Sequence, residues 1–154
     1  TPISPDFLID NQASSFVLIV DWLETNEDNE KKIAFKQFDN GDSQILLISK
    51  VTVDGNRTSV KEPISAEEYK KLTASSVLHL EKRRYELDYV QSGVAYSLKY
   101  DEFSDKKLCV LEVDGSDEDT RNAFEPSDFP ASLDEVTGDM KYYGYRVADV
   151  IEAL

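Results

Sequence analysis

The sequence predicts an α+β domain in which an antiparallel β-sheet closes, or nearly closes, into a barrel, with one helix mid-chain and one C-terminal helix. Two observations support this fold class. Apolar and polar side chains alternate over most of the chain, which is the period of β-strands. Short turn sequences at 39–42 (DNGD) and 54–56 (DGN) join successive alternating runs, as in hairpins. Many hairpins in series are typical of antiparallel barrels.

The alternating runs indicate about seven or eight strands. Within the second run, Ile33 and Phe35 share one face and Ala34 and Lys36 share the other. The expected strands are 14–24, 31–38, 43–53, 57–63, 77–90, 95–103 and 106–114. In a barrel, alternate side chains point inward, so charged residues at period 2 are candidates for the lumen.

Helical spacing replaces the period of 2 in three places. Ser65, with Glu68 three residues later, forms a capping box that starts a helix within 63–75. The acidic run 115–126 is expected to be helical in part, and 143–154 has the apolar spacing of an amphipathic helix.

The length and net charge of the chain limit the number of domains and the kinds of partner that it can bind. A chain of 154 residues suits one domain, taken as 1–154. The net charge of −14 disfavours nucleic acid and anionic membranes as partners. The apolar runs are too short to span a bilayer, and nothing in the sequence points outside the cytoplasm. The sequence is also compatible with an oligomer.

Three single-copy residues have ordinary interpretations. One cysteine, Cys109, excludes an internal disulfide and a Cys-rich zinc site, and its apolar surroundings predict a buried strand position. The one histidine, His79, is expected to have a surface or packing role rather than to act as a general base. The one tryptophan, Trp22, is expected in the core or at its rim.

Four stretches occur in a fixed order that resembles a known family. They are LEKRRYEL (80–87), AYSLKYDEF (95–103), LCVLEVD (108–114) and EVTGDMKYYGYRVA (135–148). In this order they resemble the CYTH family, the adenylate cyclase and thiamine triphosphatase group of triphosphate tunnel enzymes. The resemblance extends over nearly the whole chain and is strongest from about residue 77 onward.

The resemblance implies an eight-stranded antiparallel tunnel that holds a triphosphate on basic side chains and one or two Mg²⁺ or Mn²⁺ ions on acidic ones. Converging cations suit a triphosphate, and carboxylates suit hard divalent ions. The matching metal ligands are Glu112 and Asp114. The matching phosphate ligands are Lys36, Lys50, Arg57, Lys82 and Arg84.

Most of the acidic ligands of the family are missing. The family's first strand aligns with 2–9, where Pro2, Ser4 and Asp6 replace its Glu, Glu and Lys. Ser59 and Lys61 replace two further acids. The sequence therefore predicts a domain that binds a phosphate-rich small anion, such as a triphosphate, a nucleotide or polyphosphate, with weak or no catalysis.

Two alternatives stay open. The chain could be an active metal-dependent triphosphatase or adenylate cyclase that draws ligands from Glu62, Asp101 or Glu102. It could instead be a protein-interaction scaffold whose tunnel is closed by side chains. Asp139, in the Thr-Gly-Asp segment, is expected to serve the turn.

Overall fold

The computed structural model describes residues 3–26, 28–103, 108–131, 133, 135–136 and 149–150. These residues divide into two compact units. Unit 1 comprises the described part of 1–16 and 83–138, and unit 2 comprises that of 17–82 and 139–154. Strands β1 and β5 each contribute residues to both units.

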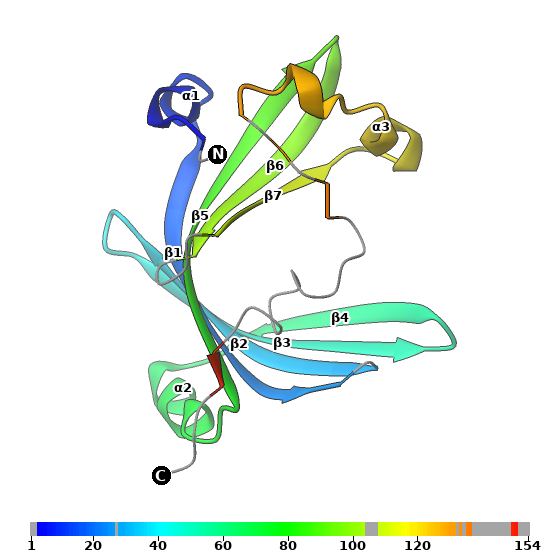
Figure 1. The fold of residues 1–154 in the computed structure, drawn as a ribbon. Coiled ribbons are helices and arrows are strands. Elements are labelled where there is room, and N and C mark those ends of the chain that lie inside the picture. The colour runs from blue at the N-terminus through cyan, green and yellow to red at the C-terminus, as the bar shows by residue number, and fades with distance from the viewer. Residues whose placement is uncertain are drawn as a thin grey trace. The chain divides into compact units, whose positions relative to one another are not determined.

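Strands make up most of the described chain (Figure 1). The strands are β1 (Ser14–Thr25), β2 (Asn29–Phe38), β3 (Ser43–Val53), β4 (Asn56–Pro63), β5 (Leu78–Gln91), β6 (Val94–Phe103), β7 (Cys109–Asp114) and β8 (Asp149–Val150). They are hydrogen-bonded in the order β4-β3-β2-β1-β5-β6-β7, and the short β8 pairs with β5. The α+β class and the antiparallel hairpins are therefore confirmed.

Closure of the sheet into a barrel stays a prediction, because β4 and β7, the two ends of the strand order, belong to different units. The predicted turns are confirmed locally. In the β3–β4 turn, Asp54 and Gly55 both have positive φ angles (52° and 77°). Ser92 and Gly93 repeat this pattern between β5 and β6, with φ angles of 52° and 78°. Two positive φ angles in succession are typical of the tight turn that suits twisted hairpins.

Unit 1 has an aromatic core. Buried side chains from β5 and β6 meet Phe124 and Phe129, which flank the 3₁₀ turn Pro126–Asp128. The rings of Tyr96 and Phe124 pack edge to face, with centroids 5.4 Å apart. The short helix α3 (Glu118–Asn122) lies in the acidic run that was expected to be partly helical.

The N-terminal segment corrects the expectation taken from the family resemblance. Residues 2–9 were aligned with a strand, but Pro5–Asp10 form helix α1. Ser4 caps this helix by accepting a hydrogen bond from the backbone N–H of Asp6, and Pro5 occupies the first turn, where its missing N–H costs nothing. Phe7 of α1 packs on Phe129 (centroids 5.4 Å apart), so local capping and the aromatic core together favour the helix.

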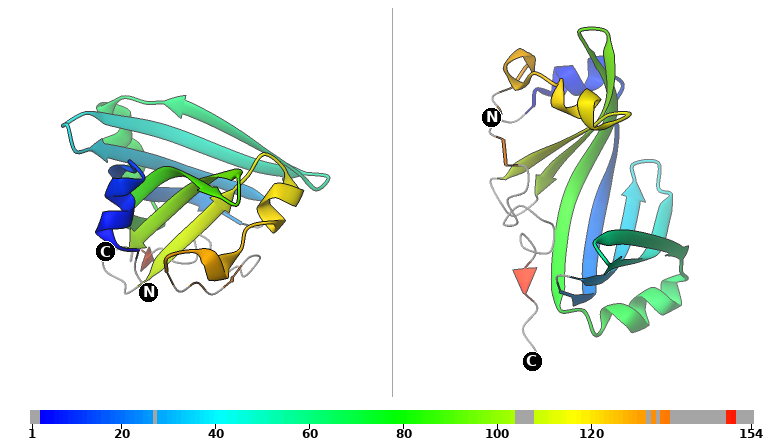
Figure 2. Two further views of the ribbon diagram at one scale, coloured as in Figure 1. Left: turned by 90° about the horizontal axis from the view of Figure 1, so that it is seen from above. Right: turned by 90° about the vertical axis from the view of Figure 1, so that its right-hand side faces the viewer.

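Unit 2 packs helix α2 (Ala66–Thr73) against one face of its strands (Figures 1 and 2). The capping box is confirmed, since Ser65 Oγ accepts a hydrogen bond from the backbone N–H of Glu68 at 3.1 Å. Tyr69 of α2 stacks on Phe35 of β2, with ring centroids 5.2 Å apart. By alternation, the Ala34 and Lys36 face of β2 points away from this helix.

The structure describes two residues of the range 143–154, Asp149 and Val150, and for these the predicted helix is wrong. Asp149–Val150 form β8 and pair with Leu78 and His79. Strand β5 is longer than β6, so a tight hairpin leaves the first residues of β5 beyond the end of β6, with backbone groups open to another strand. The rest of that range, and Asp139, lie outside the described residues.

Cys109 is also corrected: it is exposed, not buried. It begins β7 opposite Glu102, at the end of the β6–β7 pair. No helix in the described ranges is long and apolar enough to cross a membrane.

Candidate anion site on the sheet face of unit 2

Strand register brings several of the predicted phosphate ligands onto one face of unit 2. Glu30 of β2 lies opposite Lys50 of β3, and Thr52 lies opposite Arg57 of β4. Because alternate residues share a face and directly paired residues share a face, these positions lie on the side of the sheet away from α2. Lys36 belongs to the same face, further along β2 opposite Gln44.

A buried carboxylate organises this face. Glu30 is only 7% exposed and accepts hydrogen bonds from Trp22 Nε1 (2.7 Å) and Arg57 Nη2 (2.9 Å). Burial acts to raise the pKa of Glu30, but Lys32, the hydrogen bond from Trp22, and Lys50 outweigh it and hold the pKa below its ordinary value. Glu30 is therefore ionised at neutral pH and fixes the surrounding donors.

Lys32 is the most perturbed cation of the group. Its Nζ lies 3.2 Å from Glu30 Oε1 and 5.6 Å from the centre of the Trp22 ring. Burial, followed by repulsion from Lys50, lowers the pKa of Lys32 to about 8, although Glu30 acts in the opposite direction. Lys82 of β5, itself buried, adds to the lowering. We call the set of Glu30, Lys32, Lys50, Arg57 and Lys82 the lysine cluster.

The lysine cluster carries more positive than negative charge. Within the described part of unit 2, Glu30 lies close to Lys32, Lys50 and Arg57, and Lys82 acts on Lys32. Lys50 forms no ion pair in the part of the chain that the structure describes. Such an arrangement favours an added anion, because negative charge would relieve the repulsion from Lys50, which acts after burial in lowering the pKa of Lys32.

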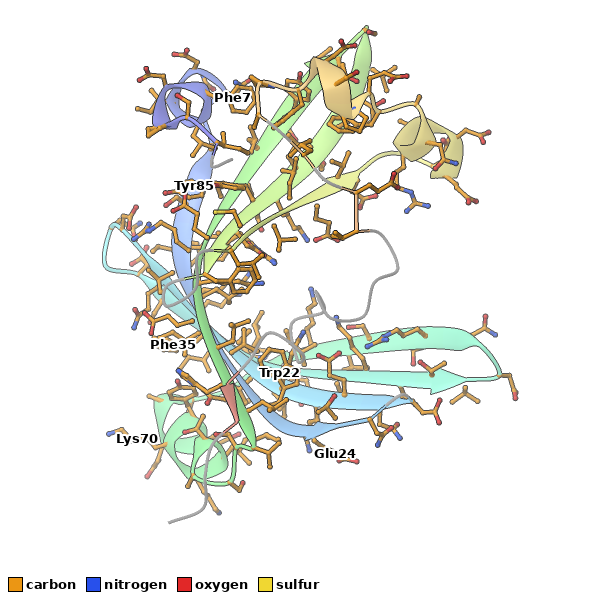
Figure 3. All side chains as sticks on the ribbon, in the orientation of Figure 1. Phe7, Trp22, Glu24, Phe35, Lys70 and Tyr85 are labelled. Carbon is orange, nitrogen blue, oxygen red and sulfur yellow. The ribbon has the colours of Figure 1, made fainter. Side chains whose placement is uncertain are left out.

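Two members of this site were not predicted from sequence. Lys32 and Glu30 were missed because neither falls on a position of the family's motif. The signal that could have found them is the Glu-x-Lys spacing of Glu30 and Lys32, which puts both side chains on the face of Lys36. Trp22 was correctly expected in the core, and it is 1% exposed (Figure 3).

Arg84 belongs to unit 1, whereas Lys82 belongs to unit 2. In unit 1, Arg84 forms a two-pronged ion pair with Asp101 of β6: Nε to Oδ1 at 2.8 Å and Nη2 to Oδ2 at 2.9 Å. Burial acts to lower the pKa of Arg84, but Asp101 and then Glu112 and Glu86 raise it. Whether Arg84 shares a tunnel with Lys82 stays a prediction.

The predicted metal ligands lie on one face of β7. Glu112 pairs with Lys99 across the strands, and Asp114 Oδ1 accepts a hydrogen bond from the backbone N–H of Gly115 and lies 3.7 Å from Arg121. Two carboxylates beside two cations are a poor donor set for Mg²⁺ or Mn²⁺, which prefer several oxygen ligands. Among the described residues, no group of three or more His, Cys, Asp or Glu is placed to hold a metal. A metal ion here stays a prediction.

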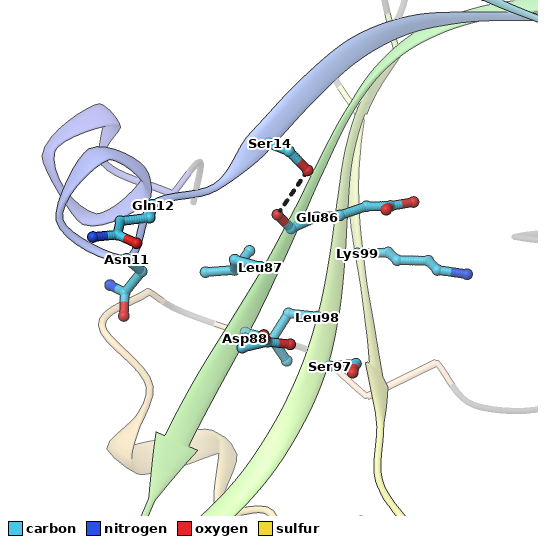
Figure 4. A pocket seen from close by; sticks show the side chains of 9 residues that line it. All are labelled: Asn11, Gln12, Ser14, Glu86, Leu87, Asp88, Ser97, Leu98 and Lys99. Carbon is cyan, nitrogen blue, oxygen red and sulfur yellow. Dashed lines mark hydrogen bonds between the residues drawn. The ribbon is translucent and has the colours of Figure 1, made fainter. Parts of the chain in front are cut away.

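Unit 1 also contains a pocket of about 640 Å³, which is a weaker candidate for an anion (Figure 4). Its lining is Asn11, Gln12, Ser14, 86–88 and 97–99. Ser14 donates its hydroxyl to the backbone carbonyl of Glu86 at 3.4 Å. The lining has one cation, Lys99, against the carboxylates of Glu86 and Asp88, so its charge opposes an anionic ligand.

His79 lies on the α2 side of unit 2, where its Nδ1 is 2.8 Å from Asp21 Oδ1. Asp21 is buried, whereas the His79 side chain is 41% exposed. The pair ties β5 to β1, which fits the packing role expected for this histidine.

The fold and the site together define an α+β protein with an antiparallel sheet and a lysine-rich polar face. No known protein family, no curated protein and no solved structure matches the chain. The resemblance to the CYTH family therefore stays a prediction that rests on the sequence motifs.

Proposed function

We propose that this chain is a triphosphate-tunnel-like domain that binds a phosphate-rich small anion, such as a triphosphate, a nucleotide or polyphosphate, with weak or no catalysis. The observation that supports the proposal is the lysine cluster, in which Lys32 and Lys50 lie close to Glu30 and Lys82 lies close enough to Lys32 to lower its pKa. We place the protein in the cytoplasm, where such anions are abundant.

The physical reason is charge density. A triphosphate carries several negative charges, and charge-assisted hydrogen bonds from Lys and Arg are about twice as strong as neutral ones. The overall charge of −14 repels large anionic polymers, but a small anion senses mainly the local cations. Mg²⁺ or Mn²⁺ would enter bound to the phosphates rather than to a dedicated protein cage.

Calorimetry with tripolyphosphate, with and without MgCl₂, tests the proposal. We expect binding in at least one condition, and Lys50→Ala should weaken it by about tenfold, since a hydrogen bond to a charged group contributes about 1.5–3 kcal/mol. Lys70→Ala is the matched control, because Lys70 is exposed on α2 and points away from the strands (Figure 3). Absence of binding in both conditions would rule the proposal out.

Catalysis is tested separately. Phosphate and cyclic AMP release should stay at background with ATP, thiamine triphosphate and tripolyphosphate in Mg²⁺ or Mn²⁺. Metal-dependent turnover of any of them would favour the active-enzyme alternative.

The interaction scaffold is a second candidate, because the Arg84–Asp101 pair engages one predicted phosphate ligand within the protein. A scaffold predicts that Lys82→Ala stabilises the fold and leaves tripolyphosphate without effect on its melting temperature. The anion-binding proposal predicts that tripolyphosphate raises the melting temperature of the unaltered chain and that Lys82→Ala reduces this gain.

A further inference from the structure

The amine of Lys32 has a geometry that anion binding alone does not require. Its side chain is only 18% exposed, with Glu30 Oε1 at 3.2 Å and the Trp22 ring at 5.6 Å. The amine is thus held between a carboxylate and an aromatic ring. A buried lysine shifts its pKa readily, and buried lysines therefore serve as general bases and in Schiff bases.

Only the neutral form of an amine has the electron pair needed for attack on carbon. Burial and Lys50 bring the pKa of Lys32 to about 8. At pH 7.5 roughly a quarter of such amines are neutral, against about 0.1% for a lysine with the ordinary pKa near 10.4. Desolvation beside another cation is a recognised way to activate a lysine nucleophile.

We propose that Lys32 is a covalent site, whose amine forms an imine with a small aldehyde that carries a phosphate group. The inference rests on the proposed function, because the anion-binding side chains supply the anchor for the phosphate. Lys50 and Arg57 flank Glu30 on the same sheet face, so they can hold the phosphate while the carbonyl lies at Lys32.

The reaction balances without an oxidant or a reductant. The nitrogen of Lys32 adds to the carbonyl carbon, and one N–H proton moves to the carbonyl oxygen. The resulting hydroxyl group then leaves with the second N–H proton as water, and a carbon–nitrogen double bond remains. Glu30, at 3.2 Å from the nitrogen, is placed to receive each proton and pass it on.

Reductive trapping tests this site on the unaltered chain. The protein is incubated with pyridoxal 5′-phosphate as the probe, reduced with borohydride, digested and mapped by mass spectrometry. We expect the label mainly on Lys32, at least tenfold above Lys70 and Lys71 on α2, with a pH midpoint near 8 and protection by tripolyphosphate. The proposal would be overturned if the most solvent-exposed lysines were labelled most strongly, or if the label fell mainly on Lys50.

Pyridoxal without the phosphate is the matched probe, and we expect it to label Lys32 at least tenfold more slowly. Equal rates would overturn the phosphate requirement. Failure of the proposed function is seen in a different experiment, in which calorimetry detects no binding of tripolyphosphate. Lys32→Arg should abolish the major label while Lys70→Arg keeps it, and circular dichroism confirms that both variants fold. A major label that persists in folded Lys32→Arg would also refute the site.

Discussion

The Nζ atom of Lys32 lies 3.2 Å from the Oε1 atom of Glu30, two residues earlier on the same strand. Both side chains are largely buried, and each shifts the pKa of the other toward the charged form. Burial and the neighbouring lysines oppose this effect at Lys32 and win, so its pKa falls. In this pair, the attraction to Glu30 favours the charged form of Lys32, whereas burial and the neighbouring lysines disfavour it. The balance between these effects can be measured.

Stability should depend on the titration of Lys32. Its pKa is about 8 in the folded chain, below the value of 10.5 for an ordinary lysine. Between these values the unfolded chain binds more protons, so the free energy of unfolding rises with pH in this window. The full shift corresponds to about 3 kcal/mol at 1.36 kcal/mol per pKa unit. Urea unfolding from pH 7 to 9.5 should show a smaller rise in Lys32→Met. Parallel curves for the two chains would contradict this.

Lys50 should control the pKa of Lys32. Lys50→Ala removes the repulsion that ranks after burial as a cause of the lowered pKa, so the pKa of Lys32 should rise. Competitive labelling with acetic anhydride, a neutral probe, measures that pKa directly. The midpoint for Lys32 should move to higher pH in Lys50→Ala and stay in place in Lys70→Ala. An unchanged midpoint in Lys50→Ala would show that burial and Lys82, and not Lys50, lower the pKa of Lys32.

Trp22 should report on the anion site by fluorescence. It is the one tryptophan of the chain, and its Nε1 donates to Glu30 while Lys32 lies over its ring. An anion that draws Lys32 away from the ring changes the charge beside the indole. Tripolyphosphate should therefore shift the emission maximum of Trp22 in a saturable way. In Lys50→Ala, half-saturation should need a higher concentration of tripolyphosphate. Sodium sulfate at matched ionic strength serves as the salt control.

The Arg84–Asp101 pair should matter for stability. Asp101→Asn keeps the shape but removes the charge that pairs with a guanidinium only 19% exposed, so we expect a loss of about 3 kcal/mol in unfolding free energy. Replacing both residues, as Arg84→Met with Asp101→Leu, should cost less. Asp114→Asn is the control, because its pair with Arg121 is exposed and 3.7 Å long, and the change should stay within about 0.5 kcal/mol. A small effect for Asp101→Asn would mean that water solvates Arg84.

The elements that were predicted well depend on neighbours along the chain. Alternation located β2 and β3, and the capping box located α2. Helix α1 was not predicted, because residues 2–9 match the first strand of the family in the resemblance; Ser4 and Pro5 are the local signal for a helix start there. Strand β8 was missed because its pairing depends on the open start of β5, which lies far away in sequence.

Three members of the lysine cluster are residues that the family resemblance implies as phosphate ligands, and that role stays a prediction. Lys50, Arg57 and Lys82 do gather within unit 2. Glu30 and Lys32 were not foreseen, although they decide the charge and the proton affinity of the site. Arg84 was expected to bind phosphate, but the structure pairs it with Asp101, a residue considered only as a metal ligand.

Period, turn chemistry and capping act over a few residues, so the amino-acid sequence alone was enough to locate β1 to β7, the tight turns and the capped helix α2. Which charges come together depends on the three-dimensional fold. The register of β2, β3 and β4 sets Glu30 against Lys50 and near Arg57, and burial then lowers the pKa of Lys32. Electrostatic energy depends on distance and solvent exposure, and neither can be read along the chain.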